Sequence, residues 1–581
     1  MLQFLKYVLG TLVGLFLFIF IILLVLGGII ASKSKNISTQ VESNSILKIS
    51  FNKAVVDQGE TYFDPFSLSK GKILGLKDIL ADLSNAAGDP KIKGIFLDYG
   101  SFPGGFASLE EIRNALIHFK ISKKPIYAYA DTYSEKAYYL SSVADKIYLN
   151  PEGLLEFHGL SSEYTFYKGA LDKLGVEVQI FRVGKYKSFV EPFTLDKMSE
   201  NNKTQVSSYL GSIYSGYIRN IAKSRSINLD SLFSISNNLK VTDASGALNY
   251  HLVNGLKYRD EVLEELRVLS HVKVIKDIPL VTLSEYNENI SPSESHSDSK
   301  ISIIFASGDI NGGEGNNKSI GSEGLSKTIR EARLNKDIKA IVLRVNSPGG
   351  SALASDIIWR EVFLTKKVKP IIVSMGDVAA SGGYYISCAA NKIFAQPNTI
   401  TGSIGIFGII PNAQKFFNEK LGITFDGVKT GKFADILTVT RPLGEDEKQI
   451  IQSQVNRGYQ SFLDRVSQGR AKTKAEIDSI SQGRVWTGEQ ALKIGLVDRL
   501  GGLDDAIKEA AKEAKLKSYS VSYETYEKKL TESLFSGAMD KIKLDLLENE
   551  LGQNKRYFNI LKTIQSWSGI QARLPLDFQN Q

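Results

Sequence analysis

The segment Gly376–Tyr385 (GDVAASGGYY) contains the residue best suited to nucleophilic chemistry, Ser381. The β-branched run at 370–374 predicts a buried strand, and the small residues after it predict a tight turn at which Ser381 opens a helix. A hydroxyl in that position is exposed to a reactant and lies at the positive end of the helix dipole. The sequence Asn-Ser-Pro-Gly-Gly at 346–350 ends a second apolar strand, and its glycines could turn backbone N–H groups toward an oxyanion. Together these residue types indicate acyl transfer.

A base for Ser381 is not obvious from the sequence. Histidine is the usual one, and none of the five histidines follows Ser381 in the chain. A triad that uses His118 or His158 stays open, because triads assemble in space in any chain order. The alternative base is a lysine, which burial keeps neutral because desolvation disfavours the ammonium form.

The chain repeats itself, and the repeat helps to find that lysine. The words IKGIFL at 92–97 and IKAIVL at 338–343 match, and so do the Tyr-Tyr pairs at 138–139 and 384–385. The tyrosine pairs give a spacing of 246 residues (384 − 138 = 246), which is typical of a tandem domain duplication. Strands that alternate with helices, such as those expected at 351–367 and 504–515, predict an α/β class for both copies.

Composition shifts along the chain predict the domain boundaries. We expect two α/β domains at 46–284 and 301–519, joined by the polar, serine-rich linker 285–300. The stretch 520–581 is rich in Lys and Glu at helical spacing, which predicts a helical C-terminal extension.

Each copy lacks one part of a catalytic pair. The position that corresponds to Ser381 in the first copy is Glu135 (381 − 135 = 246), so the first copy has no nucleophile. Matching Gly184-Lys-Tyr to Gly431-Lys-Phe places Lys187 opposite Ala434, so the second copy has no lysine there. Complementary loss predicts one composite site at the domain junction, with Lys187 as the base. The competing interpretation is that Lys187 is an ordinary solvated lysine.

Five words in the chain resemble signal peptide peptidase A (protease IV) in its long, duplicated form. The resemblance spans nearly the whole chain and implies a ClpP/crotonase-like fold in both halves, a Ser–Lys dyad and a ring-shaped homo-oligomer, which we expect to be a tetramer. It assigns the nucleophile to Ser381, the base to Lys187, and the oxyanion-binding glycines to Gly350 and Gly382. The matching words are SMGDVAASGGYY at 374–385, NSPGG at 346–350, TGSIG at 401–405, GKYKSFVEPF at 184–193 and VWTGEQA at 485–491.

Three further residues in these words carry expectations. Ser403 either orients the amine of Lys187 or only satisfies backbone groups of its turn, and the sequence leaves both open. We expect Glu191 to form a structural ion pair. Asp377 departs from the smaller or apolar residue usual in the family, and we expect its side chain to be exposed without loss of activity.

The N-terminal region predicts a membrane anchor at 1–35. Residues 7–31 are 25 consecutive apolar or small residues, and at 1.5 Å per residue they span ~37 Å, enough to cross a bilayer core. A signal-peptide core is shorter, although Gly28 and Ala31 leave cleavage possible. Positive charges on the two sides are nearly balanced, so orientation comes from the resemblance, which implies the bacterial cytoplasmic membrane with the catalytic part on the periplasmic side.

Composition narrows the remaining partners. The net charge of +8 arises from 71 basic and 63 acidic residues with no basic block interleaved with aromatics, so we expect no nucleic acid. The single cysteine, Cys388, excludes an intramolecular disulfide and a cysteine-based zinc site, and we expect it to be a small buried filler. No metal and no cofactor are expected.

These observations predict a membrane-anchored serine endopeptidase that degrades apolar peptides such as cleaved signal peptides. Two alternatives remain. A crotonase-like enzyme that binds acyl-CoA would also use backbone amides around an oxyanion, but would give Lys187 no role. An inactive scaffold that organises membrane proteins would need neither residue.

Overall fold

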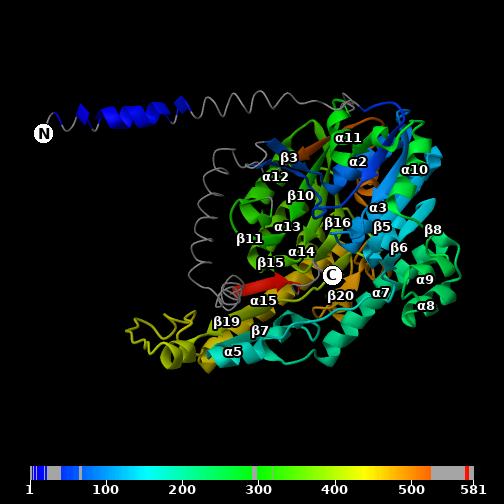
Figure 1. The fold of residues 1–581 in the computed structure, drawn as a ribbon. Coiled ribbons are helices and arrows are strands. Elements are labelled where there is room, and N and C mark those ends of the chain that lie inside the picture. The colour runs from blue at the N-terminus through cyan, green and yellow to red at the C-terminus, as the bar shows by residue number, and fades with distance from the viewer. Residues whose placement is uncertain are drawn as a thin grey trace.

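The computed structural model describes residues 3, 6–7, 9–18, 20–21, 41–64, 69–290, 297–316, 318–524 and 569–574 (Figure 1). The predicted membrane segment at 7–31 therefore lies partly outside the described residues. Within the described ranges, no helix combines the length and the apolar character that crossing a membrane requires.

The first half of the chain forms a six-stranded parallel sheet. Its order is β8-β6-β5-β4-β1-β9, so β4 and β5 lie at the centre, where their apolar side chains are buried. The strands are β1 (Ser45–Ile49), β4 (Ile92–Asp98), β5 (Ile126–Tyr133), β6 (Lys146–Leu155), β8 (Gly255–Leu256) and β9 (Leu280–Thr282). The helices are α2 (Leu76–Gly88), α3 (Phe106–Phe119), α4 (Glu135–Ser141), α5 (Lys168–Leu174), α6 (Glu191–Thr194), α7 (Glu200–Arg225), α8 (Leu229–Asn237), α9 (Ala244–Asn249), α10 (Arg259–Leu269) and α11 (Leu283–Asn289).

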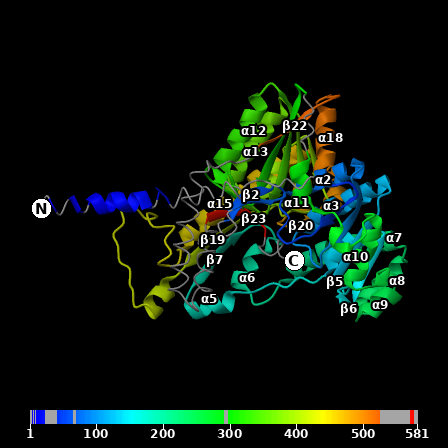
Figure 2. The ribbon, with the colours of Figure 1, turned by 45° about the horizontal axis from the view of Figure 1, so that its top comes forward.

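The second half repeats this arrangement around β14 and β16. Its order is β20-β18-β16-β14-β10-β22, with β17 beside β16 and β21 beside β17, and only β20 runs antiparallel to its neighbour. Helices α12 and α13 cover one face of this sheet and α18 covers the other (Figure 2). The strands are β10 (Lys300–Ser307), β14 (Ile338–Ser347), β16 (Ile371–Ala380), β17 (Lys392–Ala395), β18 (Ile400–Gly402), β20 (Val485–Thr487), β21 (Arg499–Leu500) and β22 (Ser520–Glu524). The helices are α12 (Ser322–Leu334), α13 (Ala352–Lys366), α14 (Gly382–Ser387), α15 (Glu445–Arg470), α16 (Lys474–Ile480), α17 (Gly488–Lys493) and α18 (Leu503–Glu513).

Matching hydrogen bonds support the register of the duplication. The Tyr138 hydroxyl donates to the Leu252 carbonyl at 2.8 Å, and the Tyr384 hydroxyl donates to the Leu496 carbonyl at 2.8 Å. Both tyrosines lie in the short helix that follows the central strand of their half. The two copies therefore hold this helix against the rest of the half by the same contact.

A third sheet joins the halves. The strand β7 from the first half pairs antiparallel with β19 from the second, which brings the segment after β7 beside the turn that ends β16. Its order is β12-β13-β11-β15-β23-β19-β7, from β7 (Glu177–Arg182), β11 (Asp309–Asn311), β12 (Gly315–Asn316), β13 (Ser319–Gly321), β15 (Gly349–Ser351), β19 (Phe407–Asn412) and β23 (Gly569–Arg573). A separate hairpin consists of β2 (Glu60–Asp64) and β3 (Ser69–Ile73).

Two stretches differ from the sequence expectation. The described part of 520–581 is strand, not helix: β22 pairs with β10 and β23 pairs with β15 and β19, because exposed sheet edges offer backbone partners that a helix would not use. Residues 285–289, expected in the polar linker, belong to α11, whose first turn is capped by the Thr282 side chain.

Candidate active site

Ser381 occupies the strand-to-helix turn that the sequence predicts. The strand β16 ends at Ala380 and α14 begins at Gly382, so Ser381 is the N-cap residue, with φ 54° and ψ −111°. A positive φ is uncommon for a residue with a side chain, and such strain is typical of a nucleophile held at a sharp turn. Its N–H donates to the Gly402 carbonyl at 2.8 Å, which fixes the turn. The side chain is buried (0% exposed), so the expectation of an exposed hydroxyl is wrong for this structure.

Lys187 lies against Ser381 although 194 residues separate them in the sequence. The Lys187 Nζ is 2.8 Å from the Ser381 Oγ, 3.0 Å from the Ser403 Oγ and 3.0 Å from the Ser403 carbonyl oxygen. The structure thus brings together the lysine of the first half and the two serines of the second.

The backbone around Lys187 is held by contacts across the junction of the halves. The Tyr186 N–H donates to the Gln482 carbonyl at 2.9 Å, and a Cβ at Gly483 would lie only 2.6 Å from the Lys187 nitrogen. A Cβ at Gly405, which lies against Gly483, would be 3.3 Å from the Lys187 Cδ. The two glycines therefore allow the second half to close tightly around the lysine stem.

This enclosure determines the charge state of the amine. Lys187 is 1% exposed, and its burial lowers the pKa of the amine well below the usual value for lysine. The centroid of the Phe407 ring lies 6.0 Å from the Nζ, and this ring contributes to the apolar surroundings. A neutral amine can accept a proton, whereas the exposed Lys185, two residues earlier, has no comparable enclosure.

The predicted oxyanion-binding glycines lie on two segments that meet beside Ser381. Gly349 has φ 103°, a conformation that favours glycine, and a Cβ there would lie 2.6 Å from the Gly382 nitrogen. A Cβ at Gly382 would in turn lie 3.0 Å from the Gly349 Cα. Gly350 follows directly in β15, so the structure places Gly350 and Gly382 on the two sides of one corner.

Comparison with known proteins identifies the family of this chain. Peptidase family S49 matches residues 118–273 and 364–517, more than half of the chain. Protease 4 of Salmonella typhi is 39% identical over 458 residues, which cover 77% of this chain and 73% of that protein.

This chain belongs to peptidase family S49. The chloroplastic serine protease SPPA of Arabidopsis thaliana is 31% identical over 545 residues, covering 92% of this chain and 78% of its own length. Among solved structures, a mutant ClpP1 from Listeria monocytogenes is 17% identical with a TM-score of 0.24, over 35% of this chain and 94% of its own. The protein is therefore an S49 serine peptidase of the long form related to protease 4, with one matched segment in each half. Membership favours peptide hydrolysis over the acyl-CoA and scaffold alternatives.

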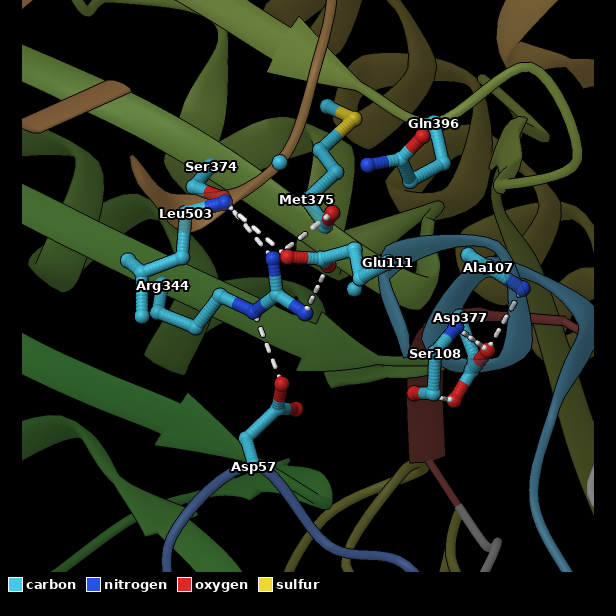
Figure 3. A network of polar contacts seen from close by, with 12 residues as sticks. Asp57, Ala107, Ser108, Glu111, Arg344, Ser374, Met375, Asp377, Gln396 and Leu503 are labelled. Atoms are coloured by element: carbon cyan, nitrogen blue, oxygen red, sulfur yellow. Dashed lines mark hydrogen bonds and ion pairs between the residues drawn. The ribbon is translucent and has the colours of Figure 1, made fainter. Parts of the chain in front are cut away.

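The S49 peptidase also contains a buried ionic network that the sequence analysis missed (Figure 3). Arg344 is 0% exposed, and its guanidinium donates to Asp57 Oδ1 and to Glu111 Oε1, both at 2.7 Å. It also donates to the Ser374 hydroxyl at 2.9 Å, on the strand that leads to Ser381. The two carboxylates raise the pKa of Arg344 against the opposing effect of burial. The sequence feature that could have revealed this network is the single arginine, Arg344, inside the apolar run 340–345.

Asp377 also contacts the first half, and the expectation that it is exposed is wrong. It is half-buried, and its Oδ1 accepts from the N–H groups of Ala107 and Ser108, at 2.9 and 2.8 Å, while Oδ2 accepts from the Ser108 hydroxyl at 2.6 Å (Figure 3). These groups open α3, where a carboxylate is favoured by the unpaired N–H groups and the helix dipole. Asp377 therefore attaches the nucleophile strand to the first half.

The remaining expectations have mixed outcomes. The Glu191 carboxylate accepts from the Ser199 N–H at 3.2 Å and from its hydroxyl at 2.6 Å, so in place of the expected ion pair it braces the start of α7. Cys388 is fully buried, as expected of a filler. His158 lies in the first half, 3.7 Å from Glu135, whereas the amine beside Ser381 is that of Lys187.

Proposed function

We propose that this S49 peptidase hydrolyses peptide bonds with Ser381 as the nucleophile and Lys187 as the general base. The observation that carries the proposal is the 2.8 Å separation of Lys187 Nζ and Ser381 Oγ inside a buried site. Burial keeps the amine neutral, which is the state that can take the hydroxyl proton.

In the first step, neutral Lys187 accepts the Ser381 proton as the Oγ attacks the carbonyl carbon of the substrate. The backbone N–H groups of Gly350 and Gly382 hold the tetrahedral oxyanion, near the positive end of α14. The ammonium of Lys187 then gives its proton to the leaving amine, and water repeats the sequence to release the acyl group from Ser381.

Ser403 acts as the positioning residue for the base. Its hydroxyl and its carbonyl oxygen both lie 3.0 Å from Lys187 Nζ. Two acceptors at fixed positions direct two N–H groups of the neutral amine away from Ser381 and leave its lone pair aimed at the Ser381 hydroxyl. Of the two roles left open by the sequence, this geometry supports the orienting one.

The setting of the enzyme is part of the proposal. We assign a ClpP/crotonase-like fold to each half on the basis of the repeated parallel sheets and the strand–turn–helix at Ser381. We propose a single-pass anchor in the bacterial cytoplasmic membrane, for which the apolar run at 7–31 is the support. The periplasmic placement of the catalytic part and the homo-tetramer rest on the family resemblance.

The proposed substrates are extended apolar peptides, such as signal-peptide remnants left in the membrane. A relative of 37% identity over 33% of this chain, from Enterococcus faecium, is described as a putative signal peptide peptidase SppA. An anchored enzyme would meet such peptides at a raised local concentration.

A fluorogenic Leu/Ala peptide tests the function directly. Ser381→Ala and Lys187→Ala should each lower kcat by roughly 10³-fold or more, because each removes a group that acts in every turnover. Lys185→Ala is the matched control, since this exposed lysine lies on the same segment, and it should retain near-normal turnover. Near-normal turnover of Lys187→Ala with a folded far-UV spectrum would refute the dyad.

The pH dependence provides a second test. Activity requires neutral Lys187, so kcat should rise with pH and level off above the pKa of this amine. Because burial lowers that pKa well below the value of a free lysine, the plateau should begin well below pH 10.

A further inference from the structure

Gln205, on α7, contacts the backbone on both sides of Lys187. Its side chain is 2% exposed, and its Nε2 donates to the Tyr186 carbonyl at 3.1 Å and to the Ser188 Oγ at 2.8 Å. A third acceptor, the Asn202 Oδ1 at 3.1 Å, lies on the same helix as Gln205. Because an amide nitrogen carries two hydrogens, Gln205 can bind the residue before Lys187 and the residue after it at the same time.

The oxygen of the same amide is bound by the second half. The Val485 N–H donates to Gln205 Oε1 at 3.2 Å, and Val485 begins β20, which lies beside α7 (Figure 1). Within the sheet Val485 pairs with Gly402 of β18, and the Gly402 carbonyl accepts the N–H of Ser381 at 2.8 Å. Gln205 therefore connects the backbone of the base, through two strands, to the turn that holds the nucleophile.

This connection adds to a direct one. The Tyr186 N–H is bound by the Gln482 carbonyl at 2.9 Å, and the Tyr186 carbonyl is bound by Gln205. Both peptide groups of Tyr186 are thus fixed, including the one that leads into Lys187. Lys187 comes from the other half of the chain, so its distance from Ser381 depends on how firmly this segment is held. A displacement of about 1 Å at a catalytic group is enough to slow a reaction by about 100-fold.

We propose that Gln205 is a positioning residue for the general base. Its amide holds the Lys187 backbone against the strands of the second half, which keeps the amine within hydrogen-bonding distance of Ser381 and shielded from water. This inference rests on the proposed Ser381–Lys187 function. It adds a residue that lies outside the segments of the nucleophile, the base and the oxyanion-binding glycines.

Loss of the Gln205 amide should change the surroundings of the Lys187 amine. When the segment can move, water reaches the amine, and its pKa should rise because burial is what lowers it. Hydrolysis should then require a higher pH. Among the described residues, the charged side chains on the surrounding segments bond to groups other than this amine. They are Lys185 and Arg484 over the Tyr186 ring, Glu191 bound to Ser199, and Asp478 bound to Gln482.

Gln205→Met tests the inference, because methionine keeps the length of the side chain and removes both ends of the amide. For the fluorogenic Leu/Ala peptide, kcat at pH 7 should fall about tenfold and KM should stay within about twofold, since the substrate contacts are unchanged. Near pH 10 the loss in kcat should shrink to about threefold, because the apparent pKa in the pH profile of kcat moves upward. A merely structural role would reduce the amount of folded enzyme and leave this apparent pKa unchanged.

Gln490→Met is the matched control. Gln490, on α17, also joins the second half to α7, since its Nε2 donates to the Ser208 carbonyl and to the Ser208 Oγ, both at 3.1 Å. These bonds leave the segment around Lys187 untouched. Gln490→Met should therefore lower the temperature of thermal unfolding but keep the wild-type kcat and pH profile. The same pH profile in Gln205→Met and Gln490→Met would overturn the inference.

Ser188→Ala is a milder second variant, which keeps the inference testable if Gln205→Met does not fold. It removes one acceptor of the Gln205 amide, so kcat at pH 7 should fall about threefold, with an upward shift of the apparent pKa. If Lys187→Ala is inactive while Gln205→Met and Ser188→Ala keep the wild-type kcat and pH profile, only this inference fails. If Lys187→Ala keeps near-normal turnover, the proposed function fails and the inference fails with it.

Discussion

The turn after the central strand exists in both halves of the molecule, but it holds different chemistry. In the first half, Glu135 begins α4, and its Oε1 accepts from the N–H groups of His158 and Gly159, both at 2.7 Å. In the second half, Ser381 precedes α14 and its hydroxyl lies against Lys187. The same two segments meet in each half, since Gly405, which packs on Lys187, is the counterpart of Gly159 (405 − 159 = 246).

The comparison teaches that the turn alone does not make a catalytic site. At Glu135 the backbone amides of the facing loop satisfy a carboxylate, whose pKa is raised by its burial and lowered by those same amides. At Ser381 the facing loop leaves room for an amine delivered by the other half. Reactivity therefore depends on what the third sheet brings across the junction.

Replacing Lys187 by Met should have the largest effect and sharpen this comparison. Peptide hydrolysis should fall by roughly 10³-fold or more, because no base remains, while the folded state should become more stable at neutral pH. Between the lowered pKa of folded Lys187 and about 10.4 in the unfolded chain, only the unfolded state binds the proton. Each unit by which the folded pKa lies below 10.4, counted down to the working pH, therefore costs the wild type about 1.4 kcal/mol, and methionine removes that cost.

Urea denaturation of wild type and Lys187→Met across pH 7 to 10 measures the gain. The stability difference should shrink as the pH approaches 10.4, because the unfolded wild type then also loses the proton. Lys185→Met serves as the control and should change neither stability nor activity, since this side chain is exposed. A gain that is constant across this pH range would mean that proton binding is not its cause.

Arg344→Met should have the next largest effect, because Arg344 in the second half binds two carboxylates of the first half. The substitution leaves the Asp57 and Glu111 carboxylates buried without their cation, and breaking such a pair costs about 3–5 kcal/mol. Thermal unfolding measures the loss. Arg330→Met is the matched control: its ion pair with Glu361 is half-exposed and should contribute little. Equal losses in the two variants would contradict a structural role for the network.

The sequence predicts the site better than it predicts the surroundings of the site. The pairing of Lys187 with Ser381 follows from comparing two copies of one fold, because a duplication shows which position has lost its residue. The roles of Arg344 and Asp377 do not follow, because their partners Asp57, Glu111 and Ser108 come from the other half and no local pattern relates them.

The strand pairing in the third sheet could not be predicted from the sequence either. Strands β14 and β16 were predictable from their apolar runs, but β7, β19 and β23 are short segments whose partners lie far apart in the chain. Local propensity says little about such pairing, since edge contacts decide it. The expected helix at 520–581 failed for this reason in its described part.

Ser403→Ala should have a smaller effect that isolates the orientation of the base. The variant keeps the carbonyl acceptor of residue 403 and loses only the hydroxyl contact to Lys187, so kcat should fall about tenfold, equivalent to about 1.4 kcal/mol. The apparent pKa in the pH profile of kcat should shift as well, which a purely structural loss would not cause. Ser403→Thr, which keeps a hydroxyl, should recover most of the rate, and an unchanged profile in Ser403→Ala would argue that the hydroxyl serves only its turn.

Glu135→Ala should have the smallest effect on catalysis, and it tests the turn of the first half. Removing the carboxylate leaves the N–H groups of His158 and Gly159 without their acceptor. Because His158 is half-exposed, water can replace part of the contact. The free energy of unfolding should therefore fall by only about 1 kcal/mol. Hydrolysis of the Leu/Ala peptide per folded molecule should stay within about twofold of wild type, because the turn in the first half supplies no group to Ser381 or Lys187. A large fall in kcat with KM and folding unchanged would show instead that the first-half turn takes part in the reaction, and the division between an inert and a reactive copy would have to be abandoned.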